Sequence, residues 1–121
     1  MVISRSNKEN REWVGEALIF SGRTNPKWNI DKEKSRMLEE TWDSLEPFTG
    51  EPPSPPILGY RGFIVKDMTG NREWFAYGGV VFLKEGGVTE SRLDKEHRFE
   101  RILLESAPNG MLPASFFELK S

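Results

Sequence analysis

Cysteine is absent from the sequence, and histidine occurs only once, at position 97. The absence of cysteine excludes disulfide bonds, thiolate metal sites and cysteine nucleophiles. A zinc site built on His97 would need three carboxylate ligands, which is a rare combination. No GxSxG-type motif is present to position a serine for a catalytic triad. We therefore expect no metal site, no cofactor and no catalytic residue of these classes.

Long apolar runs and a strong excess of one charge are also missing. No stretch approaches the roughly 20 apolar residues of a membrane span, and the apolar run from Val14 to Phe20 is interrupted by Glu16. We therefore expect no signal peptide, no membrane partner and a cytoplasmic location. The formal net charge of −2 provides no field to hold DNA or RNA, so nucleic acid is not an expected partner.

Bulky apolar residues, in contrast, are plentiful. Four Trp and eight Phe in 121 residues are enough to build a core, and the length fits one domain. The N-terminal residues up to Arg11 are mostly polar and have little to contribute to that core. The sequence therefore predicts a mobile tip over residues 1–10 and a single domain over residues 11–121.

The first half of the sequence predicts a strand, a loop and an amphipathic helix. Residues 12–20 are rich in strand formers and end at a Ser-Gly pair. Residues 23–29 contain an Asn-Pro pair and are expected to form a loop. Asp31 is a good N-cap for a helix over 31–45, whose apolar face includes Trp42. We expect Trp42 to anchor this helix to the sheet.

The next segments predict a linker followed by a β-hairpin. Five prolines make residues 47–56 a stiff, extended connector. Segments 57–66 and 74–84 have the composition of two strands joined by a turn. The Gly78-Gly79 pair is expected to bend the second of these strands.

A second helix completes the expected fold. Ser91 and Asp94 resemble a capping box, and the helix that they begin should end near Ser106, before Pro108. The apolar tail over 111–119 is expected to dock as a short helical turn. Together the segments predict an α+β fold, a small antiparallel sheet of three or more strands with two helices packed on one face.

Several chemically suggestive residues have ordinary structural interpretations. His97 lies in a charged stretch and is expected to be a solvated surface histidine. The carboxylate pairs Glu39-Glu40 and Glu96-Glu100 are expected on the polar faces of the helices. Prolines within residues 52–56 satisfy the PxxP pattern that SH3-like domains read, but the lack of flanking arginines favours a structural connector.

Two stretches combine arginine, glycine and an aromatic residue: SGRTNPKW over 21–28 and LGYRGF over 58–63. Such groups can bind an anionic or planar ligand through guanidinium hydrogen bonds and ring stacking. The candidate ligand-binding residues are Arg23, Trp28, Tyr60 and Arg61. Because the linker is long enough to retrace the first helix, the two stretches are expected to lie side by side. In the alternative interpretation, the arginines pair with acidic residues and the aromatics cap the edge of the core.

The same stretches resemble motifs of small, largely bacterial proteins that carry SGRPxPxW near the N-terminus and LGYRGF about a third of the chain later. Thr24 departs from the proline of that pattern. The resemblance implies no function.

Three functional hypotheses follow. The first is a non-catalytic binding or interaction domain, which takes a small anionic ligand or a partner protein of unknown identity. The second is a small metal-free enzyme that works with carboxylates and arginines. The third is a subunit that self-associates into a homo-oligomer through the edge of its hairpin.

Overall fold

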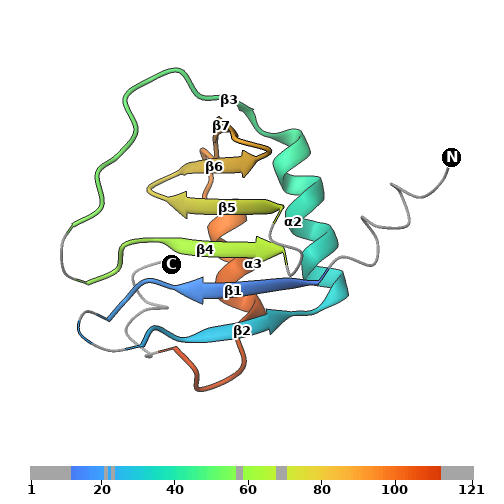
Figure 1. Ribbon diagram of the computed structural model, residues 1–121, viewed down its shortest axis with the longest axis vertical. Helices are drawn as coiled ribbons and strands as arrows, with labels where there is room; N and C mark the ends of the chain where they lie inside the picture. The colour runs from blue at the N-terminus through green and yellow to red at the C-terminus, as the bar shows by residue number, and fades with distance from the viewer. Residues whose placement is uncertain (1–11, 21, 23, 57–58, 68–70, 113–121) are drawn as a thin grey trace, which may run out of the picture.

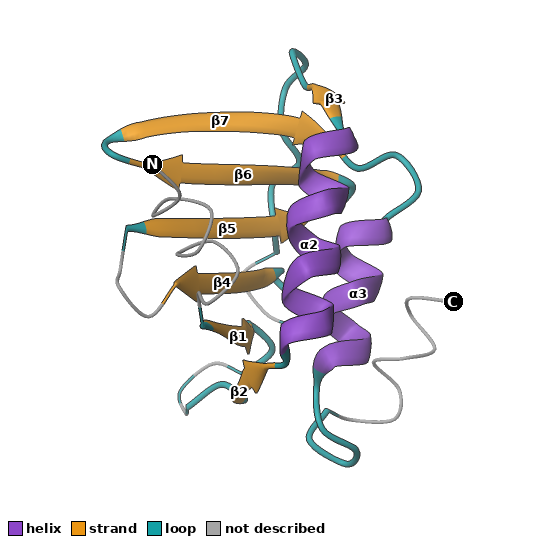
Figure 2. Cartoon of the chain, turned by 90° about the vertical axis from the view of Figure 1, so that its right-hand side faces the viewer, coloured by secondary structure: helices purple, strands orange, loops and turns teal. Residues whose placement is uncertain are grey.

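The computed structural model describes residues 12–20, 22, 24–56, 59–67 and 71–112. Within these ranges the elements are, in chain order, β1 Trp13–Ala17, β2 Lys27–Ile30, α2 Lys32–Ser44, β3 Glu46–Pro47, β4 Phe63–Asp67, β5 Arg72–Tyr77, β6 Val80–Glu85, β7 Val88–Leu93 and α3 Arg98–Ser106. The strands form one antiparallel sheet in the order β2-β1-β4-β5-β6-β7-β3 (Figure 1). Helices α2 and α3 lie together on one face of it (Figure 2).

This arrangement confirms the expected α+β fold, and the described sheet has seven strands. Asp31 caps α2 as the sequence indicated, because its carboxylate accepts a hydrogen bond of 2.7 Å from the backbone N–H of Lys34. Within the described ranges, no helix is long and apolar enough to cross a membrane. The expected mobile tip and docked tail lie outside the described residues, apart from Met111 and Leu112, of which Leu112 is buried.

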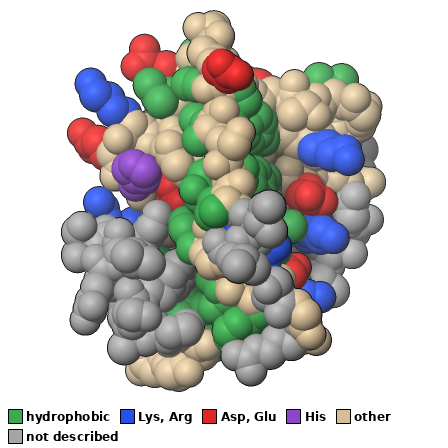
Figure 3. Space-filling view, turned by 90° about the vertical axis from the view of Figure 1, so that its left-hand side faces the viewer, with side chains coloured by type: hydrophobic (Ala, Val, Ile, Leu, Met, Phe, Trp, Pro, Cys, Tyr) green, Lys and Arg blue, Asp and Glu red, His purple; other side chains and the backbone are tan. Residues whose placement is uncertain are grey.

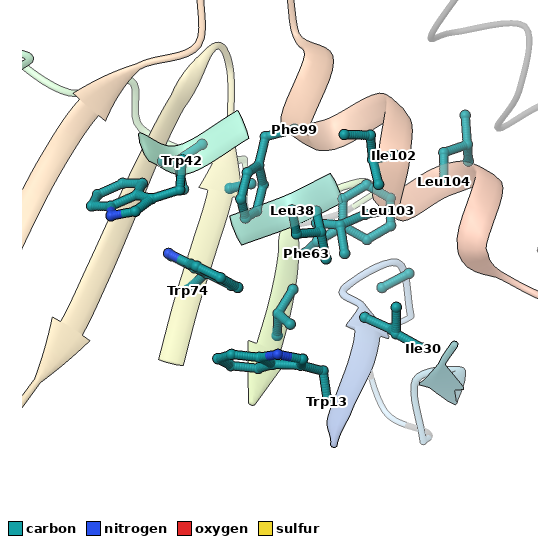
Figure 4. Close-up of a cluster of buried hydrophobic side chains, with 14 of the residues drawn as sticks. Trp13, Ile30, Leu38, Trp42, Phe63, Trp74, Phe99, Ile102, Leu103 and Leu104 are labelled. Atoms are coloured by element: carbon teal, nitrogen blue, oxygen red, sulfur yellow. The ribbon is translucent and has the colours of Figure 1, made fainter. Parts of the chain in front are cut away.

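The core lies between the sheet and the helices, and a group of aromatic rings packs within it among aliphatic side chains (Figure 4). Trp13 of β1 stacks on Trp74 of β5 with ring centroids 4.6 Å apart. Phe99 of α3 meets the other side of Trp74 edge-on at 5.1 Å. Trp42 of α2 is 3% exposed and packs 6.4 Å from Trp74. The predicted role of Trp42 as a buried contact between helix and sheet is therefore confirmed.

The segment expected to be one bent strand over 74–84 is two strands, so that prediction was wrong. Gly78 and Gly79 have φ angles of +63° and +85°, and Tyr77 pairs directly with Val80. Two successive residues with positive φ form the tight turn that joins antiparallel strands, and glycine adopts this conformation without strain. The glycine pair therefore reverses the chain instead of bending it.

The second helix also begins later than expected. Residues Val88–Leu93 form β7, which pairs with β6 through a second Gly-Gly turn. Ser91 consequently lies in a strand, and its hydroxyl donates to the carbonyl oxygen of Phe48. The N-cap position of α3 is His97, which makes no side-chain cap bond. The carboxylate of Asp94 serves the start of the helix instead, because its two oxygens accept from the N–H groups of Arg98 and Phe99 at 2.9 Å each. The capping-box interpretation of Ser91 was wrong.

Two further expectations need correction at the edges of the sheet. Residues 27–29 were expected to belong to a loop, but Lys27–Ile30 form edge strand β2, in which Trp28 and Ile30 point inward while the strand pairs with β1. Glu46–Pro47, at the start of the expected linker, form the short edge strand β3 against β7. Residues 51–56 have no regular secondary structure, as expected of a proline-rich connector.

Candidate functional site

The linker returns the chain to the end of β1, as the connection lengths predicted. Leu18 donates its N–H to Gly62 at 2.9 Å, and Arg61 donates its own N–H to Leu18 at 2.8 Å. The guanidinium group of Arg61 also donates to the carbonyl oxygen of Phe20. The segment around Arg61 therefore lies beside the start of the β1–β2 loop. Arg23 lies outside the described residues, so its proximity to Arg61 stays a prediction.

The side chains of Trp28 and Tyr60 contact other residues inside the fold. Trp28 is 5% exposed, and its indole N–H donates to the hydroxyl of Ser106 at 2.8 Å. Both rings contact Phe63, with centroids at 6.3 Å for Trp28 and 5.7 Å for Tyr60. With the carbonyl contact of Arg61, these partners fit the structural interpretation of the three residues. Their role in ligand binding stays a prediction.

The hydroxyl of Tyr60 donates a hydrogen bond to the buried carboxylate of Glu100, which helical spacing had placed on a polar helix face. Glu100 of α3 is 1% exposed, and one of its oxygens accepts a hydrogen bond from Tyr60. The other oxygen lies 2.8 Å from Nδ1 of His97 and 3.3 Å from the N–H of Gly79. Glu100 therefore joins α3, the β5–β6 turn and the segment before β4. Its expected place on a polar helix face was wrong.

Glu39 of α2 was assigned to a polar face in the same way and is also buried. It is 5% exposed and accepts two hydrogen bonds from one nitrogen of Arg72, at 2.9 and 3.1 Å. This ion pair ties α2 to β5. Helical spacing alone did not reveal either carboxylate, because each is buried by partners distant in sequence.

Burial in this region raises the pKa of two side chains. Desolvation, and then the charge of Glu100 and its hydrogen bond, raise the pKa of Tyr60 far above its ordinary value. Desolvation also raises the pKa of Asp94, although the N–H groups of Phe99 and Arg98 oppose the shift. Tyr60 is therefore a firmly protonated donor to Glu100.

His97 forms the junction between this buried network and the surface. Its side chain is 49% exposed, and Figure 3 shows the histidine on the face at the end of the sheet. Its backbone has a φ of +58°, which is uncommon for a residue other than glycine and persists only where the surroundings enforce it. The hydrogen bond to Glu100 provides such surroundings, and so does Gly79, where an added Cβ atom would lie 3.5 Å from the imidazole ring. They fix the residue from which α3 begins.

The first turns of α3 form one wall of a groove on the outer surface of the two helices. The groove has a volume of about 330 Å³ and is lined by Met37, Glu40, Thr41, Ser44, Arg98, Arg101, Ile102 and Glu105. Met37 and Ile102 provide its apolar surface. Thr41 and Ser44 add hydroxyl groups, but the hydroxyl of Ser44 donates to the carbonyl of Thr41 at 2.7 Å.

Among the described residues, the carboxylates that line the groove have basic partners, whereas its two arginines have no acidic partner. Glu40 lies 3.9 Å from Arg36, and Glu105 lies 3.7 Å from Lys34. In the part of the chain that the structure describes, neither Arg98 nor Arg101 pairs with a carboxylate, and the guanidinium group of Arg101 donates only to the carbonyl of Glu96 at 3.3 Å. Two guanidinium groups therefore keep most of their donors available to a ligand.

Sequence reasoning missed this groove because α2 and α3 come together only in the fold. The pairing of Lys34 with Glu105 shows that the helices run antiparallel side by side. The available signal was the pair Arg98 and Arg101, which are three residues apart and so share one helical face. Among the described residues, no three histidine, aspartate or glutamate side chains are close enough to hold a metal ion.

Comparison with protein-family models, with curated proteins and with solved structures gives no match for this chain.

Proposed function

We propose that the protein is a non-catalytic binding domain that takes a small organic anion in the groove between α2 and α3. The observation that carries this proposal is the pair of guanidinium groups, Arg98 and Arg101, without carboxylate partners beside an apolar surface. It retains the first hypothesis from the sequence and moves the ligand from the Arg61 region to the helices.

The donor geometry of arginine favours carboxylate or phosphate groups. A guanidinium presents several N–H groups in a planar fork, which matches the spacing of two anionic oxygens. Arg98 and Arg101 share one face of α3, so a single anion can contact both. The carboxylates of Glu40 and Glu105 lie 3.9 Å from Arg36 and 3.7 Å from Lys34, and these positive charges offset part of their repulsion of such a ligand.

The rest of the groove limits the size and polarity of the ligand. A volume of about 330 Å³ lies near the lower end of the range of small-molecule sites. Met37 and Ile102 can contact a short apolar body attached to the anionic group. The class that fits is a small carboxylic acid or phosphate monoester with a non-polar portion.

The groove favours binding over catalysis because the hydroxyl of its serine, Ser44, is not activated. Catalytic serines donate to a general base, whereas Ser44 donates to a backbone carbonyl of its own helix. The imidazole of His97 is oriented by Glu100 and is not among the residues that line the groove. The groove lining therefore offers anion donors without a paired nucleophile and base.

A thermal-shift screen with small carboxylates and phosphate monoesters tests the proposal, because a ligand that binds only the folded state raises its melting temperature. Hits should stabilise the wild type and have no effect on the double variant Arg98→Gln/Arg101→Gln. The double variant Lys66→Gln/Lys84→Gln removes the same amount of charge from exposed positions of β4 and β6 and should respond like the wild type. The proposal fails if no compound stabilises the wild type, or if hits stabilise the Arg98/Arg101 variant equally.

A further inference from the structure

The proline-rich segment 51–56, with the sequence EPPSPP, lies at the surface of the folded domain. All six of its residues are exposed, and the segment passes outside the turn between β5 and β6 (Figure 1). Figure 3 shows hydrophobic side chains, in which prolines are included, in a band along this face. The structural connector therefore also displays its prolines to solvent.

The covalent structure of the segment restricts it to an extended helix. Proline fixes its own φ near −65°, and a residue before proline is restricted to the extended region. Four of the six residues precede a proline, and the described residues contain no cis peptide bond. The segment is therefore held close to the polyproline II conformation, which has three residues per turn.

One contact determines which edge of this helix faces the domain. Pro53 packs against Gly78, so closely that a Cβ atom added to Gly78 would lie 2.8 Å from Cγ of Pro53. Residues three apart share an edge of a polyproline II helix, so Pro53 and Pro56 are on the inward edge. Pro52 and Pro55 share a second edge, and Glu51 and Ser54 share the third.

We propose that segment 51–56 is a docking ligand for a folded partner domain that has an aromatic-lined groove for polyproline II helices. Such grooves accept two X-Pro dipeptides that are separated by one residue, which requires two adjacent edges of the helix. The outward edges offer this pattern as Glu51-Pro52 and Ser54-Pro55. The inward edge supplies only the spacer residue, Pro53, between them.

The fold prepares the segment for binding by holding both of its ends. Phe48 exchanges two hydrogen bonds with Ser91 of β7, at 3.0 and 3.3 Å. After the segment, the N–H of Arg61 is bonded to Leu18. A segment that is already ordered loses less conformational entropy when it binds. The whole protein should therefore bind more tightly than the isolated peptide.

Charge indicates the character of the partner's groove. Residues 46–60 contain two glutamates, Glu46 and Glu51, and no lysine or arginine. A partner groove with an acidic pocket for a flanking arginine would find no such arginine in this segment. Its acidic groups would also repel Glu51. The partner that fits has an aromatic groove with a neutral or basic rim.

Binding of the 121-residue protein to a panel of purified SH3 and WW domains, measured by isothermal titration, tests this proposal. Domains with a neutral or basic rim should bind the wild type, and those with an acidic rim should bind at least about tenfold more weakly. The variant Pro52→Ala/Pro55→Ala should lose at least about tenfold in affinity. The matched variant Pro53→Ala/Pro56→Ala, which changes the inward edge, should stay within about threefold of the wild type.

Circular dichroism of both variants confirms that they are folded before their affinities are compared. The proposal is overturned if no domain of the panel binds the wild type, or if the inward and outward variants lose affinity equally. Equal loss would mean that the segment is recognised as a loose chain and not through the two edges that Gly78 leaves exposed.

Discussion

Nδ1 of His97 lies 2.8 Å from Oε1 of Glu100, and this contact joins a half-exposed side chain to one that is 1% exposed. Glu100 also accepts from Tyr60 and from the N–H of Gly79, so three separate parts of the fold meet at one carboxylate. The start of α3 is consequently fixed against the end of the sheet. Because Arg98 follows His97 directly, the contact between His97 and Glu100 also helps to position Arg98 in the groove.

Removing the hydroxyl of Tyr60 should destabilise the protein, because Glu100 would lose a donor inside the fold. We expect Tyr60→Phe to cost roughly 1 to 3 kcal/mol of unfolding free energy, measured by urea denaturation. Tyr77→Phe is the matched control, since Tyr77 contacts the Tyr60 ring at 5.7 Å but has no side-chain hydrogen bond among the described residues. Its cost should stay within about 0.5 kcal/mol. Equal costs for the two variants would contradict the role of the Tyr60 hydroxyl.

The raised pKa of Tyr60 predicts a loss of stability at alkaline pH. The folded protein holds the Tyr60 proton at pH values where the unfolded chain, with a tyrosine pKa of about 10, releases it. The folded state then binds more protons than the unfolded state, so the unfolding free energy falls as the pH rises through about 10. Urea midpoints between about pH 9 and pH 11 should fall more steeply for the wild type than for Tyr60→Phe. Parallel declines would show that Tyr60 does not cause the loss.

Trp42 should account for much of the attachment of α2 to the sheet. It packs against Trp74, and the guanidinium group of Arg92 lies 4.2 Å from the centre of its ring. We expect Trp42→Ala to cost roughly 3 to 5 kcal/mol, as for other large truncations in a core. Val88, which is 69% exposed, serves as a surface control, and Val88→Ala should change the unfolding free energy by less than about 0.5 kcal/mol. A cost below about 1 kcal/mol for Trp42→Ala would rule out this role.

The Glu39–Arg72 pair should behave as a coupled unit. Its side chains are only 7% and 11% exposed, so removing one partner leaves the other charge poorly solvated and without this ion pair, although the carboxylate of Glu85 still lies 3.4 Å from Nε of Arg72. We expect Glu39→Leu or Arg72→Met to cost about 3 to 5 kcal/mol each. The double variant should cost clearly less than the sum, because it removes both charges of the pair. Additive costs in denaturant titrations would show that the two residues act independently.

The sequence predicts well those features that depend on neighbouring residues. Helix α2 follows from the cap at Asp31 and the apolar spacing that places Leu38 and Trp42 on one face. The extended linker follows from its prolines. Local patterns failed where strand pairing decided the structure. Residues 91–93 were expected to begin a helix, but the Gly86-Gly87 turn brings Val88–Leu93 into register with β6.

The candidate site was largely inaccessible to sequence reasoning for the same reason. Glu100 looks like any exposed helix glutamate until Tyr60 and Gly79, which are 40 and 21 residues away, are placed beside it. The groove requires α2 and α3 to pack against each other, and no local pattern encodes that contact. In contrast, the return of the chain to the end of β1 followed from connection lengths alone.

The most direct test of the proposed function is a titration with a hit from the anion screen, followed by NMR of the side-chain methyl groups. The methyl signals of Met37 and Ile102, which line the groove, should shift with ligand concentration, while that of Val88, in the β6–β7 hairpin, should not. The Arg98→Gln/Arg101→Gln variant should show no shifts over the same range. Saturable shifts elsewhere in the protein, with Met37 and Ile102 unchanged, would contradict an anion site between the helices.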